Sequence, residues 1–127
     1  MLSRQVGMNI ILWIVAAALA AAFLASGVLK LVWSRERLAA AGMGWATRFS
    51  ARSVKGIGVL EILAAVGLVV PAALGIAPVL APLAATGLVL LMAGAIVTHL
   101  RRREMQPVAI NLVFLGLSAF VAWSRFF

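Results

Sequence analysis

The sequence contains no cysteine and no aspartate, and His99 is its only histidine. Without cysteine, this chain cannot perform disulfide exchange or thiolate catalysis, and it cannot ligate an iron–sulfur cluster or form a cysteine-based zinc site. A single histidine also excludes a multi-histidine metal centre, and no glycine-rich phosphate loop follows a strand pattern. We therefore expect no metal site and no resident cofactor.

Charged residues are scarce as well, at 11% of 127 residues, whereas 65% are hydrophobic and the mean hydropathy is +1.17. A soluble domain of this size is nearer half apolar, so lipid is the expected solvent for most of the chain. The formal net charge is +8, but the basic residues flank apolar runs, which is typical of cytoplasmic loops and not of a nucleic-acid-binding face. We expect one membrane domain covering residues 1–127.

Long apolar runs predict an all-α fold, a transmembrane four-helix up-down bundle. One span needs roughly 20 apolar residues, and the predicted spans cover residues 8–33, 54–71, 78–99 and 107–124. The uncharged run 62–98 holds two spans, because turn-forming residues divide it: Pro71, Gly75, Pro78 and Pro82. The first apolar run is longer than a signal-peptide core, so we expect a true span there.

Local signals predict both ends of the second span, but they leave two interpretations of the segment before it. Ser53 is the expected N-cap of that span, and Pro71 is expected to end or kink it. The basic loop 34–53 fits either a short helix lying in the membrane interface or a solvated cytoplasmic loop.

The distribution of lysine and arginine predicts the orientation. Eight basic residues lie in the first and third connections: Arg35, Arg37, Arg48, Arg52, Lys55, Arg101, Arg102 and Arg103. Only Arg4 and Arg125 lie on the other side. Because basic loops stay in the cytoplasm, we expect loops one and three to be cytoplasmic and both termini to be outside.

Each predicted span carries one polar residue toward its cytoplasmic end, namely Lys30, Glu61, His99 and Asn111. At about 1.5 Å per residue, Lys30 and Asn111 lie roughly 6 Å inside the span ends and Glu61 roughly 9 Å inside. Ionisable side chains within spans usually face the bundle interior and pair. The four residues therefore form a candidate ligand-binding cluster.

Simpler interpretations of these residues stay open. Lys30 can snorkel to the headgroups, His99 can be a boundary residue, and Asn111 can join helices by hydrogen bonding. Glu61 is hardest to explain in this way because its side chain is short. We predict a Lys30–Glu61 ion pair, which either serves function or only fixes the register of the first two spans.

The chain resembles the DoxX-like family through motifs spread over nearly its whole length. The motifs are Gly27-Val28-Leu29-Lys30-Leu31, Gly56-Ile57-Gly58 with Glu61, Pro71, Ala93-Gly94-Ala95 with His99, and Asn111 after Pro107. The resemblance implies a small four-helix protein of the bacterial inner membrane. The best-described relatives are a membrane subunit of a thiosulfate:quinone oxidoreductase and partners of oxidative-stress enzymes. If polar residues at these positions are functional in the family, the resemblance implies Lys30, Glu61, His99 and Asn111 as the site residues of this chain.

Three functions are considered, and the first is favoured. The bundle can act as a binding or assembly subunit that holds a lipid, quinone or other apolar small molecule near the cluster, or docks a redox enzyme on the cytoplasmic side. It can instead be an isomerase-type enzyme in which Glu61 and His99 act as acid and base. The third candidate, a proton-coupled multidrug exporter, fits less well because Glu61 lies in the second span and Lys30 occupies the first. Small residues on the spans permit a homo-oligomer without requiring one.

Overall fold

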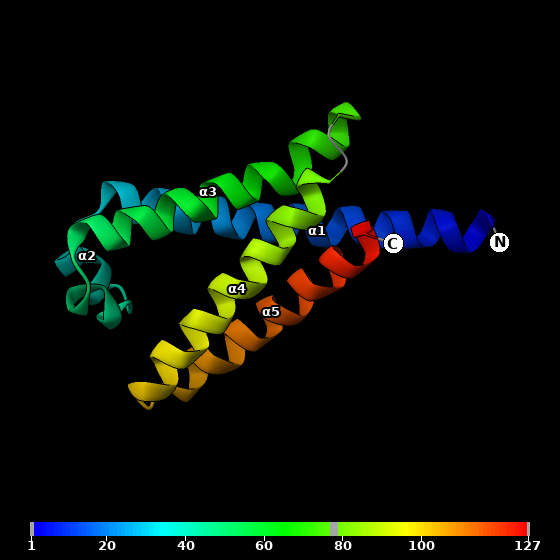
Figure 1. Ribbon diagram of the computed structural model, residues 1–127. Coiled ribbons are helices and arrows are strands. Elements are labelled where there is room, and N and C mark those ends of the chain that lie inside the picture. The colour runs from blue at the N-terminus through cyan, green and yellow to red at the C-terminus, as the bar shows by residue number, and fades with distance from the viewer. Residues whose placement is uncertain (1, 77–78, 127) are drawn as a thin grey trace.

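Four long helices run alternately up and down in the computed structural model, which describes residues 2–76 and 79–126, with side chains from residue 7 onward (Figure 1). They are α1 (Leu2–Val32), α3 (Ala51–Leu74), α4 (Leu80–Arg101) and α5 (Met105–Phe126). The short helix α2 (Arg35–Ala40) and the 3-10 helix η1 (Gly44–Arg48) join α1 to α3. Each of the four long helices is long and apolar enough to cross a membrane. The predicted all-α transmembrane bundle is confirmed.

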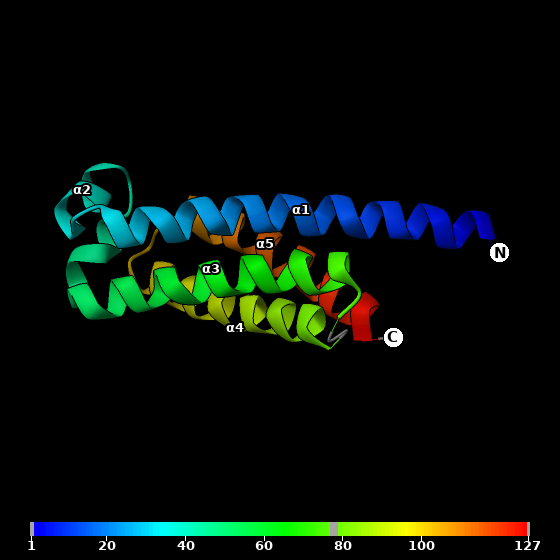
Figure 2. The ribbon, with the colours of Figure 1, turned by 90° about the horizontal axis from the view of Figure 1, so that it is seen from above.

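The bundle consists of two helical hairpins. α1 packs mainly on α3 and α4 mainly on α5, while α3 and α4 join the hairpins and α1 touches α5 less. Figure 2 shows the pairs as two layers, and Figure 1 shows that they are inclined to each other. The apolar core lies where the layers meet, and its buried members are Leu19, Phe23, Ala64, Ala65, Leu68, Ala85, Leu88, Met92 and Val121.

Two contacts between small residues set the helix spacing. A Cβ atom added to Gly27 of α1 would lie 2.6 Å from the carbonyl oxygen of Gly58 in α3, and one added to Gly58 would lie 2.8 Å from that of Gly27. A Cβ added to Gly67 of α3 would lie 2.9 Å from the Cβ of Ala84 in α4. Small residues permit such close approach in lipid, where packing drives helix association. The hairpins therefore touch near the α3–α4 turn and separate toward the end that holds α2, η1 and residues 102–104, which we call the polar end.

The segment between α1 and α3 is folded onto the polar end. Leu38 of α2, Ala46 of η1 and Val54 of α3 form a small buried cluster. Partly buried side chains pack around it, namely Leu29, Trp33, Met43 and Trp45. Gly42, with a φ of 106°, separates α2 from η1. A fully solvated loop would not bury this apolar surface, so the segment forms a packed cover.

The predicted start of the second span is wrong by one turn. The N-cap of α3 is Ser50 and not Ser53, because the Ser50 hydroxyl accepts a hydrogen bond from the Ser53 N–H at 3.1 Å. A side-chain oxygen three residues before a free helical N–H is the usual capping geometry. The helix therefore begins at Ala51.

Pro71 does not end α3, which continues to Leu74. The helix closes at Gly75, whose φ of 67° lets the Ile76 N–H donate to the Pro71 carbonyl at 3.0 Å. A left-handed residue with this six-to-one bond is the Schellman ending, which glycine favours. Pro78, where the third span was expected to begin, lies outside the described residues. Pro82 falls in the first turn of α4, where proline is tolerated.

Two tryptophan–arginine contacts mark the length of α1 that matches a bilayer. The Arg37 guanidinium lies 4.2 Å from the Trp33 ring centroid, and that of Arg125 lies 5.2 Å from Trp13. The two tryptophans are about 30 Å apart along α1 at about 1.5 Å per residue, which equals the thickness of a typical hydrocarbon core. The N-terminal end of α1 extends beyond the other helices (Figures 1 and 2).

The contact between Gly27 and Gly58 yields a testable prediction. Gly27→Ala places a Cβ atom against the Gly58 carbonyl oxygen, so we expect a lower thermal midpoint in detergent and a loss of about 1–3 kcal/mol of stability, typical of overpacking. Gly116→Ala is the matched control, because a Cβ on Gly116 meets no atom within 4 Å. Equal midpoints for the two variants would show that α1 and α3 are not in backbone contact at Gly27.

Candidate functional site

A buried ion pair lies beside the closest approach of α1 and α3. Lys30 follows Gly27 by one turn, and Glu61 follows Gly58 by one turn. Helical side chains lean toward the N-terminus of their own helix, so in this antiparallel pair the two lean toward each other. Lys30 Nζ lies 2.7 Å from Glu61 Oε1, and the two side chains are only 6% and 5% exposed. The predicted Lys30–Glu61 pair is therefore present.

Lys30 does not extend toward the headgroups. Its ammonium donates to the hydroxyl of Ser26, one turn earlier in α1, at 2.5 Å and lies 5.6 Å from the Trp45 ring centroid. Our sequence reasoning missed both partners. The i−4 spacing of Ser26 was a usable signal, whereas the position of Trp45 depends on how η1 folds.

The carboxylate of Glu61 is only partly satisfied. Oε1 pairs with Lys30, but Oε2 is buried and has no hydrogen-bond partner among the residues that the structure describes. A buried polar oxygen without a donor is unfavourable by roughly 1–3 kcal/mol. This oxygen therefore retains the capacity to accept one more hydrogen bond.

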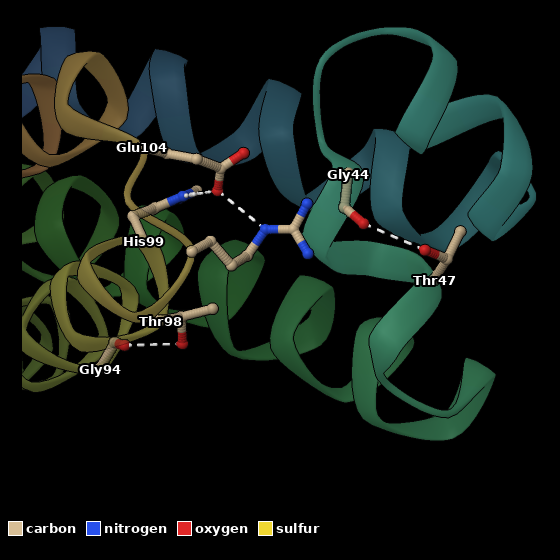
Figure 3. Close-up of polar contacts among 7 residues, drawn as sticks. Gly44, Thr47, Gly94, Thr98, His99 and Glu104 are labelled. Carbon is tan, nitrogen blue, oxygen red and sulfur yellow. Dashed lines mark hydrogen bonds and ion pairs between the residues drawn. The ribbon is translucent and has the colours of Figure 1, made fainter.

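His99 belongs to a separate polar contact at the end of α4. Its Nδ1 lies 3.0 Å from Glu104 Oε1, which also accepts a hydrogen bond from Arg102 Nε at 2.9 Å (Figure 3). The hydrogen bond with His99 and then that from Arg102 hold the pKa of Glu104 below its ordinary value. No hydrogen bond or ion pair among the described residues joins His99 to Lys30 or Glu61.

The backbone of the α4–α5 turn brings Glu104 back to His99. Arg103 adopts a left-handed φ of 57°, and the Glu104 N–H donates to the His99 carbonyl at 2.9 Å. This is again a Schellman ending, formed here without glycine. Arg102 also reaches the other loop, because a Cβ on Gly44 would lie 2.8 Å from its Nη2. The turn and η1 are therefore in contact at the polar end.

A groove of about 1270 Å³ lies between the hairpins. Lys30, Glu61, His99 and Asn111 all line it, together with Trp45, and the rest of its length is mainly apolar. Along α3 it extends from Ile57 to Pro71, about 21 Å at about 1.5 Å per residue. The structure thus places all four predicted residues around one groove, although only Lys30 and Glu61 pair with each other.

The groove opens toward lipid. Several of its lining side chains are exposed large hydrophobic residues, namely Leu60, Leu63, Leu83, Leu90 and Ile110. Within residues 2–76 and 79–126, no three His, Cys, Asp or Glu side chains come together as a metal site would require. The arrangement suits an elongated apolar molecule with a polar end.

Removing one partner of the buried pair tests its energetic role. Glu61→Leu leaves the Lys30 ammonium buried and unpaired, which typically costs about 3–5 kcal/mol, so we expect a large fall in the thermal midpoint in detergent. The double variant Lys30→Met with Glu61→Leu should recover most of the loss. Glu36→Leu, at an exposed position, is the control and should change the midpoint little. A Glu61→Leu protein as stable as this control would contradict a buried pair.

The contacts of Glu104 predict a pH dependence. Because its pKa is lowered in the folded protein, its ionised form stabilises the fold above the ordinary glutamate pKa, and this contribution is lost as the pH falls through the lowered value. A carboxylate NMR titration should show that His99→Ala raises the Glu104 pKa most, followed by Arg102→Ala. Arg101→Ala is the neighbouring control and should leave it unchanged. If the Glu104 pKa were the same in His99→Ala as in the unaltered protein, the hydrogen bond between Glu104 and His99 would be contradicted.

Comparison with known proteins agrees with this architecture. A model of the DoxX-like family matches residues 14–121, a range that includes all four candidate residues. No curated protein and no solved structure matches the chain. Four apolar helices and the family match together identify a small integral membrane protein that contacts the lipid bilayer. The chain belongs to the DoxX-like family.

Proposed function

We propose that this protein is a membrane binding subunit that holds an elongated apolar molecule, a lipid or a quinone, in the groove between its hairpins. The observation that carries the proposal is that the charged side chains lining the groove lie together at one end of it, while the rest of the groove is mainly apolar. Ligand sites are usually apolar clefts in which a few polar groups fix orientation. The polar end of the molecule would lie near Lys30, Glu61, His99 and Asn111.

The surroundings of the groove support a ligand that comes from the membrane. The part of the groove beyond Glu61 along α3, from Glu61 to Pro71, is about 15 Å long at about 1.5 Å per residue, which matches half of a hydrocarbon core of about 30 Å. A single extended tail from one leaflet would therefore fit along it. The basic residues at the polar end favour a cytoplasmic location for that end, with both termini outside.

The contacts of the two acid–base candidates give no support to an enzyme. Glu61 Oε1 is engaged by Lys30, and His99 Nδ1 is engaged by Glu104. A general acid and base must both reach the same substrate atoms, and the two residues are held by different partners on different helices. The contact with Lys30 likewise occupies Oε1 of Glu61, so it gives no support to an exporter that uses this carboxylate.

Filling the groove tests the proposal. Gly94 lines the groove, and a Cβ there meets no atom within 4 Å. Gly94→Phe should therefore occupy the groove without overpacking and lower the amount of co-purified apolar molecule more than tenfold. The measurement is organic extraction of the purified protein followed by mass spectrometry.

Gly116→Phe provides the matched control, because Gly116 has the same open surroundings and does not line the groove. It should retain the amount found in the unaltered protein. Extracts that match the bulk lipid composition in all three proteins would overturn the proposal.

A further inference from the structure

We infer that the groove selects apolar molecules whose polar head donates a hydrogen bond, such as a hydroxyl group, and that Glu61 Oε2 is the acceptor. The inference rests on the proposed function and adds the chemistry of the ligand head. It follows from the donors and acceptors that the wall formed by α1 and α3 leaves unused.

The lysine has little left to offer a ligand. An ammonium group has three donor protons and no acceptor. Lys30 directs two of them to Glu61 Oε1 and Ser26 Oγ, and its ammonium also faces the Trp45 ring at 5.6 Å. A ligand head that only accepts hydrogen bonds can therefore reach at most one donor of Lys30.

The glutamate offers the opposite chemistry. An ionised carboxylate accepts hydrogen bonds and donates none, and Oε2 of Glu61 is buried without a partner in the described part of the chain. Glu61 also lines the groove. A hydroxyl group that reaches Oε2 would satisfy this oxygen with a charge-assisted bond, which is stronger than a bond between neutral groups.

The facing wall does not reverse this preference. His99, Gln106 and Asn111 line the groove on α4 and α5, and amide side chains both donate and accept. They accommodate either kind of head, so the selectivity comes from Glu61. Long-chain or isoprenoid alcohols satisfy the requirement, and so does the hydroxyl of a reduced quinone. A carbonyl-only head, as in an oxidised quinone, does not.

A matched pair of probes tests the inference. The full chain in detergent micelles is titrated with oleyl alcohol or with oleyl methyl ether, and bound probe is counted by native mass spectrometry. The two probes share the hydrocarbon tail and differ in the donor. We expect the alcohol to bind about tenfold more tightly, since a hydrogen bond to a charged group is typically worth that factor or more.

Glu61→Gln should remove or reverse the preference for the alcohol. The glutamine oxygen can still accept from Lys30, which leaves an amide donor in place of Oε2, so the variant should lose the alcohol preference or favour the ether. Should this variant fail to fold, the double variant Lys30→Met with Glu61→Leu removes both charges and the acceptor at position 61, so it should bind the two probes equally. Val113→Ala, at an exposed position outside the groove, should keep the alcohol preference.

The outcomes separate the two proposals. Equal binding of alcohol and ether to the unaltered protein overturns the inference while leaving a groove that holds apolar molecules. Retention of the alcohol preference in the folded Glu61→Gln protein also overturns the inference, because another group must then accept the bond. Failure of both probes to bind, together with extracts unaffected by Gly94→Phe, overturns the proposed function and the inference with it.

Discussion

The burial of one lysine and one glutamate in a membrane bundle is the constraint on which the rest of this structure depends. Charges within a span are unfavourable unless they pair, and the close approach of α1 and α3 places Lys30 Nζ 2.7 Å from Glu61 Oε1. The contact between Gly27 and Gly58 supplies that closeness, one turn from each charged residue. The glycines and the ion pair therefore lie together at the closest approach of α1 and α3.

The second hairpin is joined to the first at a different level, and the groove results from that difference. Gly67 and Ala84 bring α3 and α4 together near their shared turn, whereas the polar ends of the hairpins diverge (Figure 1). Across the divergence the Arg102 guanidinium lies against Gly44. One hairpin contributes the charged pair and the other contributes His99 and Asn111, so the candidate site is formed by both hairpins together.

Depth along a helix was predictable from the sequence, but direction around it was not. A fixed rise per residue placed Lys30 and Glu61 at similar depth, and the high cost of an unpaired charge made their contact the natural expectation. His99, expected at the boundary of its span, bonds to Glu104 because Arg103 adopts a left-handed conformation that no residue pattern indicated. The N-cap of α3 shows the same limit of sequence reasoning. Ser50 and Ser53 are both plausible N-cap residues, and only the path of the backbone decides that Ser50 is the cap.

The sideways opening of the groove has a consequence for what controls its occupancy. Exposed leucine and isoleucine side chains line it, so the proposed ligand would enter from the surrounding bilayer without dissolving in water. The relevant concentration is then the mole fraction of that molecule within its leaflet. Occupancy of the groove by the proposed ligand would therefore follow the composition of the membrane, even when the aqueous phases on both sides stay constant.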